Sequence, residues 1–366
     1  MEFHEMLRKM VIEKASDLFL KVGSPPSLRI DGAINFLDTD EVTPQDTLEV
    51  FEIIEDSKKD GFRGEQYEVD VAYELPGIGR FRVNIFRQKG YLGFVFRHVE
   101  GLIPSFDDLN LPSESLIKLA ESSRGLVLVT GQAGSGKSTT LAAMINHINE
   151  RQNKHIITIE DPIEYIFKDQ KSVIDQREIG IDTQNFVTAL KHAVRQSPDV
   201  ILIGEMRDRE TMEAALNAAE TGHMVMATLH TVNATQTVER IINYFPPHQH
   251  ALIRLQLSLI LRGVISQRLI PCKSEAGRIP AVELMVESPT VKDLLSAGKT
   301  PELYECIKEG EYYGSQTFNQ SLKKLYQADH ISLENAMLYS DYPEELKLEL
   351  KGIFKGAMST DFNFNY

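Results

Sequence analysis

Residues 131–140, GQAGSGKSTT, combine glycines with a lysine and a serine at the spacing of a phosphate-binding loop. Gly131 is followed by four residues and then by Gly136, Lys137 and Ser138, which fits the pattern G-x-x-x-x-G-K-[ST]. Glycines let successive backbone N–H groups face anionic oxygens, and the start of a following helix adds partial positive charge. Lys137 would reach the β- and γ-phosphates, and the Ser138 hydroxyl would bind Mg²⁺.

The loop therefore predicts a site for ATP with Mg²⁺. The alternative is an ordinary glycine turn, and the complete match between an apolar run and a helical pattern argues against it. Thr139 and Thr140 lie in the first helical turn, where a hydroxyl can contact the α-phosphate. We expect the nucleotide to be bound by Gly131, Gln132, Ala133, Gly134, Ser135, Gly136, Lys137, Ser138 and Thr139.

Two acidic stretches end other apolar runs, at the strand ends where α/β sheets bind ligands. In ITIEDPIEY, any of Glu160, Asp161 and Glu164 has the chemistry to orient an attacking water, although these acids also suit a capped turn. In DVILIGEMRD, Glu205 follows a glycine at the end of the run. It is a candidate for binding Mg²⁺ through water, and a surface carboxylate is the alternative.

A third apolar run, HMVMATLHT, carries two histidines. His223 and His230 are seven residues apart, so on a strand they point to opposite faces and do not share a metal. His230 follows the last apolar residue and is placed to hydrogen-bond the γ-phosphate. A histidine at a strand end also suits a purely structural role.

The elements that position these residues are four continuous apolar runs, at 125–130, 155–160, 199–204 and 223–229. Such runs predict strands buried on both faces, and the helical patterns between them predict a parallel α/β sheet. If the 155–160 strand lies between the 125–130 and 199–204 strands, the domain has a RecA-like core. From about residue 246 the pattern is mainly helical.

Residues 1–99 have a different texture, with alternating short runs such as GRFRVNIFRQ, and predict a small α+β domain that begins with a helix over residues 1–20. The segment 100–112 reads as a linker, and 113–366 as the second domain. A nucleotide site between subunits would need an arginine to neutralise the transferred phosphoryl group. The candidates are Arg80, Arg82, Arg87 and Arg97, with solvent-exposed strand charges as the alternative.

Composition limits the function. The net charge of −14 disfavours a protein whose main task is to bind nucleic acid, which needs a concentrated basic surface. The two cysteines, Cys272 and Cys306, form neither a disulfide framework nor a four-cysteine zinc site. The first 20 residues mix acids and bases with apolar residues, so we expect no signal peptide, and there is no stretch of 18 apolar residues. We therefore expect a soluble, cytoplasmic protein.

The four motifs, in this order and spacing, resemble the Walker A, Asp box, Walker B and His box of the type II/IV secretion ATPases, and most resemble those that retract type IV pili. The resemblance covers nearly the whole chain. It implies a PAS-like N-terminal domain, a RecA-like ATPase domain with a helical C-terminal region, and a homohexamer. It assigns Lys137 to Walker A and implies catalytic roles for Glu164, Glu205, His230, Arg82 and Arg97.

The resemblance also implies partners: an inner-membrane pilus platform protein, with pilin reached indirectly, at the cytoplasmic face of the inner membrane. One segment departs from the family. Retraction ATPases are expected to carry Ala-Ile-Arg-Asn-Leu-Ile-Arg-Glu after the PAVE strand, where residues 290–297 here read TVKDLLSA. Alternatives are a pilus-assembly or secretion ATPase, expected to have a further N-terminal domain and a zinc insert, and a RecA-like nucleic-acid motor.

Overall fold

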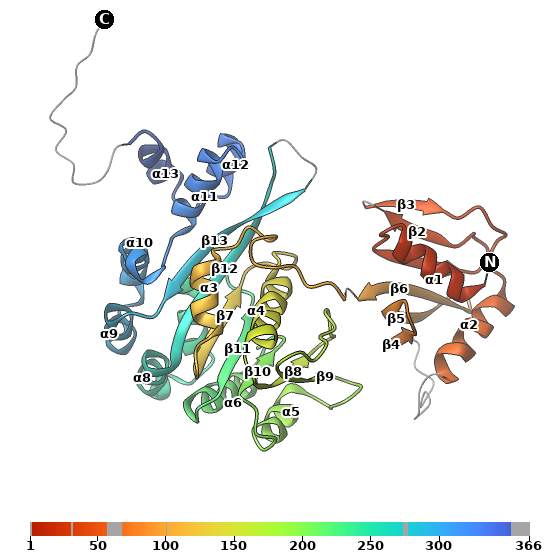
Figure 1. Cartoon of the computed structure of the whole chain (residues 1–366), viewed down its shortest axis with the longest axis horizontal. Helices are drawn as coiled ribbons and strands as arrows, with labels where there is room; N and C mark the ends of the chain where they lie inside the picture. The colour runs from red at the N-terminus through yellow and green to blue at the C-terminus, as the bar shows by residue number, and fades with distance from the viewer. Residues whose placement is uncertain (1, 31, 57–67, 100, 274–276, 353–366) are drawn as a thin grey trace, which may run out of the picture. The chain divides into compact units, whose positions relative to one another are not determined.

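A computed structural model describes residues 2–30, 32–56, 68–99, 101–273 and 277–352. The chain divides into two compact units. The first unit is Met1–Leu102 with Glu164–Ile166, and the second unit is Ile103–Ile163 with Phe167–Tyr366. Figure 1 labels most of the helices and strands of both units.

The first unit is built on a six-stranded antiparallel sheet in the order β3-β2-β1-β6-β5-β4. Its core contains the buried face of β5, where Phe81, Val83 and Ile85 alternate with partly exposed residues. The elements of this unit are α1 (Phe3–Ile12), β1 (Asp17–Lys21), β2 (Ser27–Ile30), β3 (Ala33–Phe36), α2 (Pro44–Asp56), β4 (Glu68–Leu75), β5 (Gly79–Gln88) and β6 (Tyr91–Val99).

The N-terminal helix is shorter than the sequence predicts. It ends at Ile12, and Lys14 follows with a positive φ of 53°. Leu18 belongs to β1 and pairs with Phe96 of β6, so its apolar side chain serves a strand and not a helix. The expected helix over residues 1–20 is wrong after residue 12. Apolar residues four to seven positions apart fit one continuous helix, but they also fit a helix that is followed by a turn and a strand.

The second unit contains a seven-stranded sheet in the order β13-β12-β7-β11-β10-β8-β9. Neighbouring strands are parallel except β13, which pairs antiparallel with β12. The strands are β7 (Gly125–Thr130), β8 (His155–Glu160), β9 (Val173–Glu178), β10 (Val200–Ile203), β11 (Met224–Leu229), β12 (Leu261–Pro271) and β13 (Arg278–Val286).

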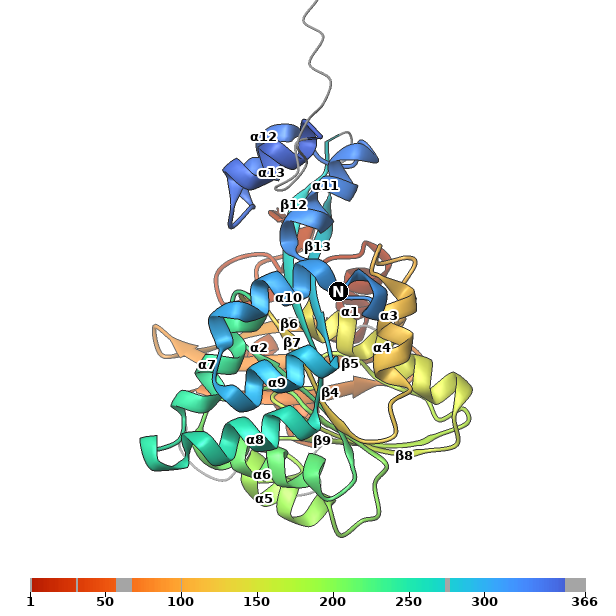
Figure 2. The same ribbon diagram turned by 90° about the vertical axis from the view of Figure 1, so that its left-hand side faces the viewer.

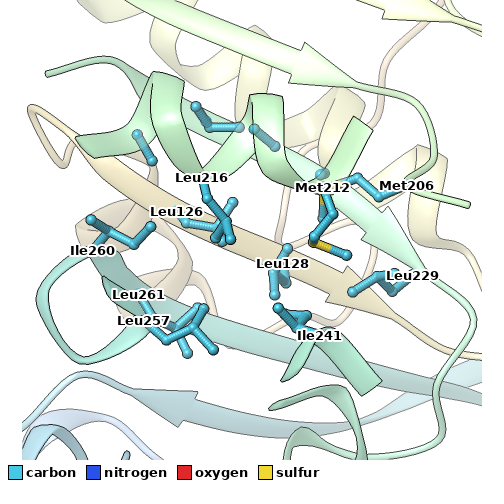
Figure 3. Packing of buried hydrophobic residues seen from close by; sticks show 14 of the residues in the cluster. Leu126, Leu128, Met206, Met212, Leu216, Leu229, Ile241, Leu257, Ile260 and Leu261 are labelled. Atoms are coloured by element: carbon cyan, nitrogen blue, oxygen red, sulfur yellow. The ribbon is translucent and has the colours of Figure 1, made fainter. Parts of the chain in front are cut away.

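Helices cover both faces of this sheet, as the four apolar runs predict. On one face α3 and α4 pack against Val127, Val129 and neighbouring strand residues. On the other face α5 to α10 pack against Leu126, Leu128 and their neighbours. Figure 2 shows these helices from a second direction. Figure 3 shows how buried residues on the face with Leu126 and Leu128 pack together. The helices are α3 (Ser113–Ala120), α4 (Lys137–Arg151), α5 (Phe186–Ala193), α6 (Arg209–Glu220), α7 (Ala234–Asn243), α8 (His250–Ile260), α9 (Pro289–Ala297) and α10 (Leu303–Glu309).

The strand order corrects one expectation. β8 does not lie between β7 and β10; β11 lies beside β7, β10 beside β11, and β8 beyond β10. The connection from β7 through α4 to β8 therefore passes over two strand positions in the sheet. These positions are occupied by β10 and β11, which come later in the chain. The ends of β7, β11 and β10, with the three motifs that follow them, are consecutive along one edge of the sheet.

The region after residue 246 is not mainly helical in its first part. Two of the longest strands, β12 and β13, extend the sheet beside β7. The run HALIRLQLSLILRGVISQRL divides at Leu261, where α8 ends and the β-branched residues Val264 and Ile265 enter the strand. The outer part of the β12–β13 hairpin then packs against the last helices, α11 (Phe318–Gln327), α12 (Leu333–Leu338) and α13 (Pro343–Leu350).

Most of the segment 100–112, which is predicted as a linker, belongs to the second unit. Phe106 and Leu111, both within 100–112, are buried in the same cluster as α3 and α4.

Among the described residues, no helix is long and apolar enough to cross a membrane.

Candidate functional site

The predicted phosphate loop lies between β7 and α4, and its glycines take conformations that other residues rarely adopt. Gly131, Gly134 and Gly136 have φ values of 146°, 73° and 89°. A Cβ atom at Gly131 would lie 2.4 Å from the Ser135 Oγ and 2.5 Å from the Gln267 carbonyl oxygen. The loop therefore requires glycine at position 131 for space as well as for φ.

The side chains of the loop fit a polyanionic ligand. The Lys137 ammonium is buried and donates to the carbonyl oxygens of Gly131 and Gln132, at 3.0 and 2.9 Å. The Ser135 Oγ is buried, and it has no hydrogen-bond partner within the described residues. A buried hydroxyl needs a partner, and a phosphate oxygen bound in the loop would supply one. Lys137 is also the first residue of α4, so the loop leads directly into a helix N-terminus.

β12 holds the loop from the side opposite β11. Thr130, the last residue of β7, donates its hydroxyl to the Ser266 Oγ at 2.9 Å. Gln267 exchanges side-chain hydrogen bonds with Thr140 of α4, and both residues are buried. No local pattern predicts these contacts, because the leucines of β12 continue the helical spacing of α8.

Glu205 and His230 meet at the ends of β10 and β11. The His230 Nε2 lies 3.2 Å from the Glu205 Oε1, and the Arg207 guanidinium contacts the Glu205 Oε2 at 2.7 Å. Burial raises the pKa of Glu205, but Arg207 and His230 together outweigh that effect and hold this pKa below its usual range. Glu205 is therefore a carboxylate at neutral pH, as an acid that binds Mg²⁺ must be. Arg207 was overlooked, although it stands two residues after Glu205.

Gly204 explains why Glu205 does not follow β10 directly. Its N–H donates to the Ile159 carbonyl at 2.7 Å, and a Cβ atom at Gly204 would lie 3.2 Å from the Cα atom of Glu160. The Thr228 hydroxyl, from β11, donates to the Gly204 carbonyl at 2.5 Å. The three strands thus converge on a residue without a side chain, and the first side chain beyond them is that of Glu205.

The three acids of the ITIEDPIEY stretch have separate environments. Glu160 ends β8 and accepts from the Thr158 hydroxyl at 2.6 Å. Asp161 is exposed and acts electrostatically on Arg207, towards the Glu205 cluster. Glu164 is exposed and belongs to the first unit. Its catalytic role stays a prediction.

The two arginines expected to act on phosphate lie on neighbouring strands of the first unit, where Arg82 of β5 pairs in register with Arg97 of β6. Arg82 lies 3.4 Å from Asp70. Arg97 donates twice to one oxygen of Asp17, at 3.0 and 2.8 Å. Each arginine therefore has an acidic partner within its own sheet, and the expected role of both stays a prediction.

A pocket of about 450 Å³ adjoins the phosphate loop within the second unit. Residues 131–135 line one part of it, and Arg268, Tyr339 and Asp341 line another. Arg268 donates to both carboxylate oxygens of Asp341, at 2.7 and 2.8 Å, and its guanidinium lies 3.9 Å from the centre of the Phe318 ring. This pocket was not foreseen, because its walls come from β12 and the last helices.

The combined geometry can bind a polyphosphate and polarise its terminal group. The loop offers an ammonium, hydroxyls and a helix N-terminus, while the neighbouring strand ends offer an ionised carboxylate beside an imidazole. Such an arrangement supports phosphoryl transfer, which depends on positioning and on charge neutralisation.

Comparisons with known proteins agree with this chemistry. The family model described as "Type II/IV secretion system protein" matches residues 105–329. The chain is 43% identical to the type IV pilus ATPase PilU of Pseudomonas aeruginosa over 352 residues, covering 96% of this chain and 92% of that protein. It is 41% identical to the type IV pilus retraction ATPase PilT of the same organism over 345 residues, covering 94% and 99%. The crystal structure of the pilus retraction motor PilT with bound ADP matches with a TM-score of 0.88 and 44% identity, over 95% of this chain and 99% of that one.

Proposed function

The chain belongs to the type II/IV secretion ATPases, and we propose that it is a hexameric motor that couples ATP hydrolysis to the retraction of type IV pili, and so to twitching motility. One observation carries this proposal: the phosphate loop, Glu205 and His230 occupy consecutive strand ends of a single sheet. Similarity to PilT and PilU over nearly the whole chain supports the link to pili.

Each residue of the site has a proposed role. Lys137 and the backbone N–H groups of the loop bind the phosphates, and the neighbouring pocket takes the nucleoside. Ser138 and Glu205 would hold Mg²⁺, Glu205 partly through water, and the ion would neutralise charge on the β- and γ-phosphates. Glu164 orients the attacking water, and His230 hydrogen-bonds the γ-phosphate. Arg82 and Arg97 stabilise the charge of the transferred group.

The proposal extends to the organisation of the protein. Residues 1–99 would be a PAS-like domain, 100–112 a linker and 113–366 a RecA-like ATPase domain. The RecA-like assignment rests on membership of the family, because β8 does not lie between β7 and β10. The chain would form a homohexamer at the cytoplasmic face of the inner membrane. There it would act on a pilus platform protein, and through that protein on pilin, without binding nucleic acid.

Lys137→Ala tests the proposal at the level of chemistry. Removing the ammonium leaves the β- and γ-phosphate charge without its main partner, so ATP hydrolysis should fall at least about a hundredfold. A phosphate-release assay of the purified full chain measures this. Turnover close to that of the unmodified protein would contradict the assignment of the loop.

Deletion in the parent organism tests the direction of work. Loss of a retraction motor leaves cells with excess surface pili that do not twitch, and the gene carrying Lys137→Ala should fail to restore twitching. Cells without surface pili would instead identify an assembly ATPase.

A further inference from the structure

The segment that carries His230 is short and is held at both ends. It spans His230–Asn233, between the end of β11 and the start of α7. Asn233 caps α7 by accepting from the Gln236 N–H at 2.9 Å. Where α7 begins therefore determines where His230 lies relative to Glu205, 3.2 Å away.

A carboxylate from a distant strand fixes the first residue of α7. Glu283 lies on β13, and its side chain is 3% exposed. Its Oε1 accepts a hydrogen bond from the Ala234 N–H at 2.8 Å. The contact joins residues 49 positions apart in the sequence, so it fixes α7 relative to the β12–β13 hairpin.

Two charged groups act on Glu283, and both belong to the wall of the pocket beside the phosphate loop. Arg268 lies on β12, and Asp341 follows α12. Arg268 also contacts the Val232 carbonyl at 3.4 Å, within the His230–Asn233 segment. The segment is thus held by two side chains of the hairpin, Glu283 at its end and Arg268 one residue before the cap.

The acid at position 283 is more than a helix cap requires. Asn233 accepts from the Gln236 N–H, and a neutral side-chain oxygen would be enough for the Ala234 N–H. A buried carboxyl is unfavourable unless it is paired or hydrogen-bonded. Burial raises the pKa of Glu283 to about 7, although the Ala234 N–H and Arg268 act in the opposite direction and Asp341 adds to the rise. Its charge therefore changes within the neutral range.

We propose that Glu283 is a positioning residue for ATP hydrolysis: it fixes the start of α7 and so holds His230 against Glu205. The inference rests on the proposed role of His230. A carboxylate accepts a stronger hydrogen bond than a carboxylic acid does. The segment is therefore held most firmly when Glu283 is ionised, and turnover should rise as Glu283 loses its proton.

The same titration acts on stability with the opposite sign. The pKa of Glu283 is raised in the folded chain, so its contribution to stability is complete below the unfolded value of about 4.5 and is lost as the pH rises through about 7. Ionisation of Glu283 should therefore raise turnover and lower the free energy of unfolding.

Glu283→Gln separates the two features of the carboxylate. The amide oxygen still accepts from Ala234, but the side chain cannot ionise. In the unmodified protein, kcat should rise between pH 6 and pH 8 as Glu283 loses its proton. In Glu283→Gln this rise should be smaller, while the Kd for a non-hydrolysable Mg-ATP analogue stays within about twofold of the unmodified value. Glu283→Ala removes the acceptor as well, and kcat at pH 8 should fall roughly tenfold to a hundredfold.

Glu287→Gln is the matched control. Glu287 follows the same strand, but it pairs with Arg262 and Lys292 near the start of β7, away from the phosphate loop. Its pH profile should equal that of the unmodified protein.

Three outcomes are decisive. An unchanged pH profile in Glu283→Gln would overturn the inference, even if Glu283→Ala fails to fold. An equal change in Glu287→Gln would also overturn it, because the effect would then be one of general charge. Absence of ATP hydrolysis in the unmodified protein would instead overturn the proposed function.

Discussion

At the scale of single residues, Asp17 raises a question about one of the predicted phosphate-contacting arginines. Its side chain is 6% exposed and faces two guanidinium groups, Arg97 at 2.8 Å and Arg29 at 3.3 Å. A buried carboxylate needs such partners. Arg97 therefore has a structural task within the first unit that is independent of any nucleotide.

Arg97→Ala and Arg29→Ala distinguish the two tasks. Each substitution removes one cation from Asp17, so each should lower the free energy of unfolding by about 1–2 kcal/mol in urea titrations. Only Arg97→Ala should lower kcat strongly, by at least about tenfold, if Arg97 also stabilises the transferred phosphoryl group. Equal kcat values for the two variants would leave Arg97 with the structural task alone.

The motif residues were predictable from sequence because each lies within a few positions of a recognisable strand end. Lys137 and Ser138 follow a fixed spacing, and Glu205 and His230 each follow an apolar run. Arg268 and Glu283 were not predictable. Their contacts depend on which strands are neighbours, and no local pattern encodes that.

At the scale of elements, the phosphate loop depends on how closely β12 approaches it. The Gln267 carbonyl of β12 and the Ser135 hydroxyl both lie where a side chain at position 131 would begin. Gly134 has a similar requirement for positive φ, but a Cβ atom there would meet no atom within 4 Å. Gly134 therefore reports the effect of positive φ alone, and Gly131 reports the effects of φ and space together.

Gly131→Ala should abolish nucleotide binding, while Gly134→Ala should only weaken it. Gly134→Ala introduces strain of about 1–2 kcal/mol from its left-handed backbone. Gly131→Ala introduces strain at a φ of 146°, outside that region, and adds a clash with backbone that cannot move without shifting β12. Binding of a fluorescent ATP analogue measures the difference. Similar losses in both variants would mean that space beside β12 is not limiting.

The sequence predicts the parallel sheet of the second unit, but it predicts neither the order of the strands nor the presence of β12 and β13 at one edge. Continuous apolar runs predicted β7, β8, β10 and β11 correctly, because burial on both faces leaves no other composition. The expected position of β8 is wrong, and β12 is not predicted because its leucines continue the helical pattern of α8. α2 is not among the predicted elements, although its apolar residues are closely spaced between Leu48 and Ile54.

At the scale of the whole molecule, the net charge of −14 bears on assembly. Copies of an acidic chain repel one another over about 10 Å at 0.1 M salt and over about 30 Å at 0.01 M. A hexamer held by short-range contacts should therefore form less readily at low ionic strength.

Light scattering of the full chain tests this expectation. We expect the mass of a hexamer in 0.15 M salt with an ATP analogue, and smaller species in 0.01 M salt. Lys137→Ala without nucleotide should show the same salt response, because its change lies inside the phosphate loop. A monomeric mass under every condition would contradict the proposed hexamer.

The β12–β13 hairpin extends from the core of the sheet to the core of the last three helices. The strands pair without interruption from Gly263 opposite Val286 to Pro271 opposite Arg278. Near one end Ser266 contacts Thr130, while Ile270 and Ile279 at the other end belong to the core of α11–α13. A two-stranded ladder resists sliding, because a shift of one residue reverses every side chain. A tilt of β12 beside the phosphate loop would therefore displace the last three helices further than the loop itself, as a lever arm amplifies the small movement at its pivot.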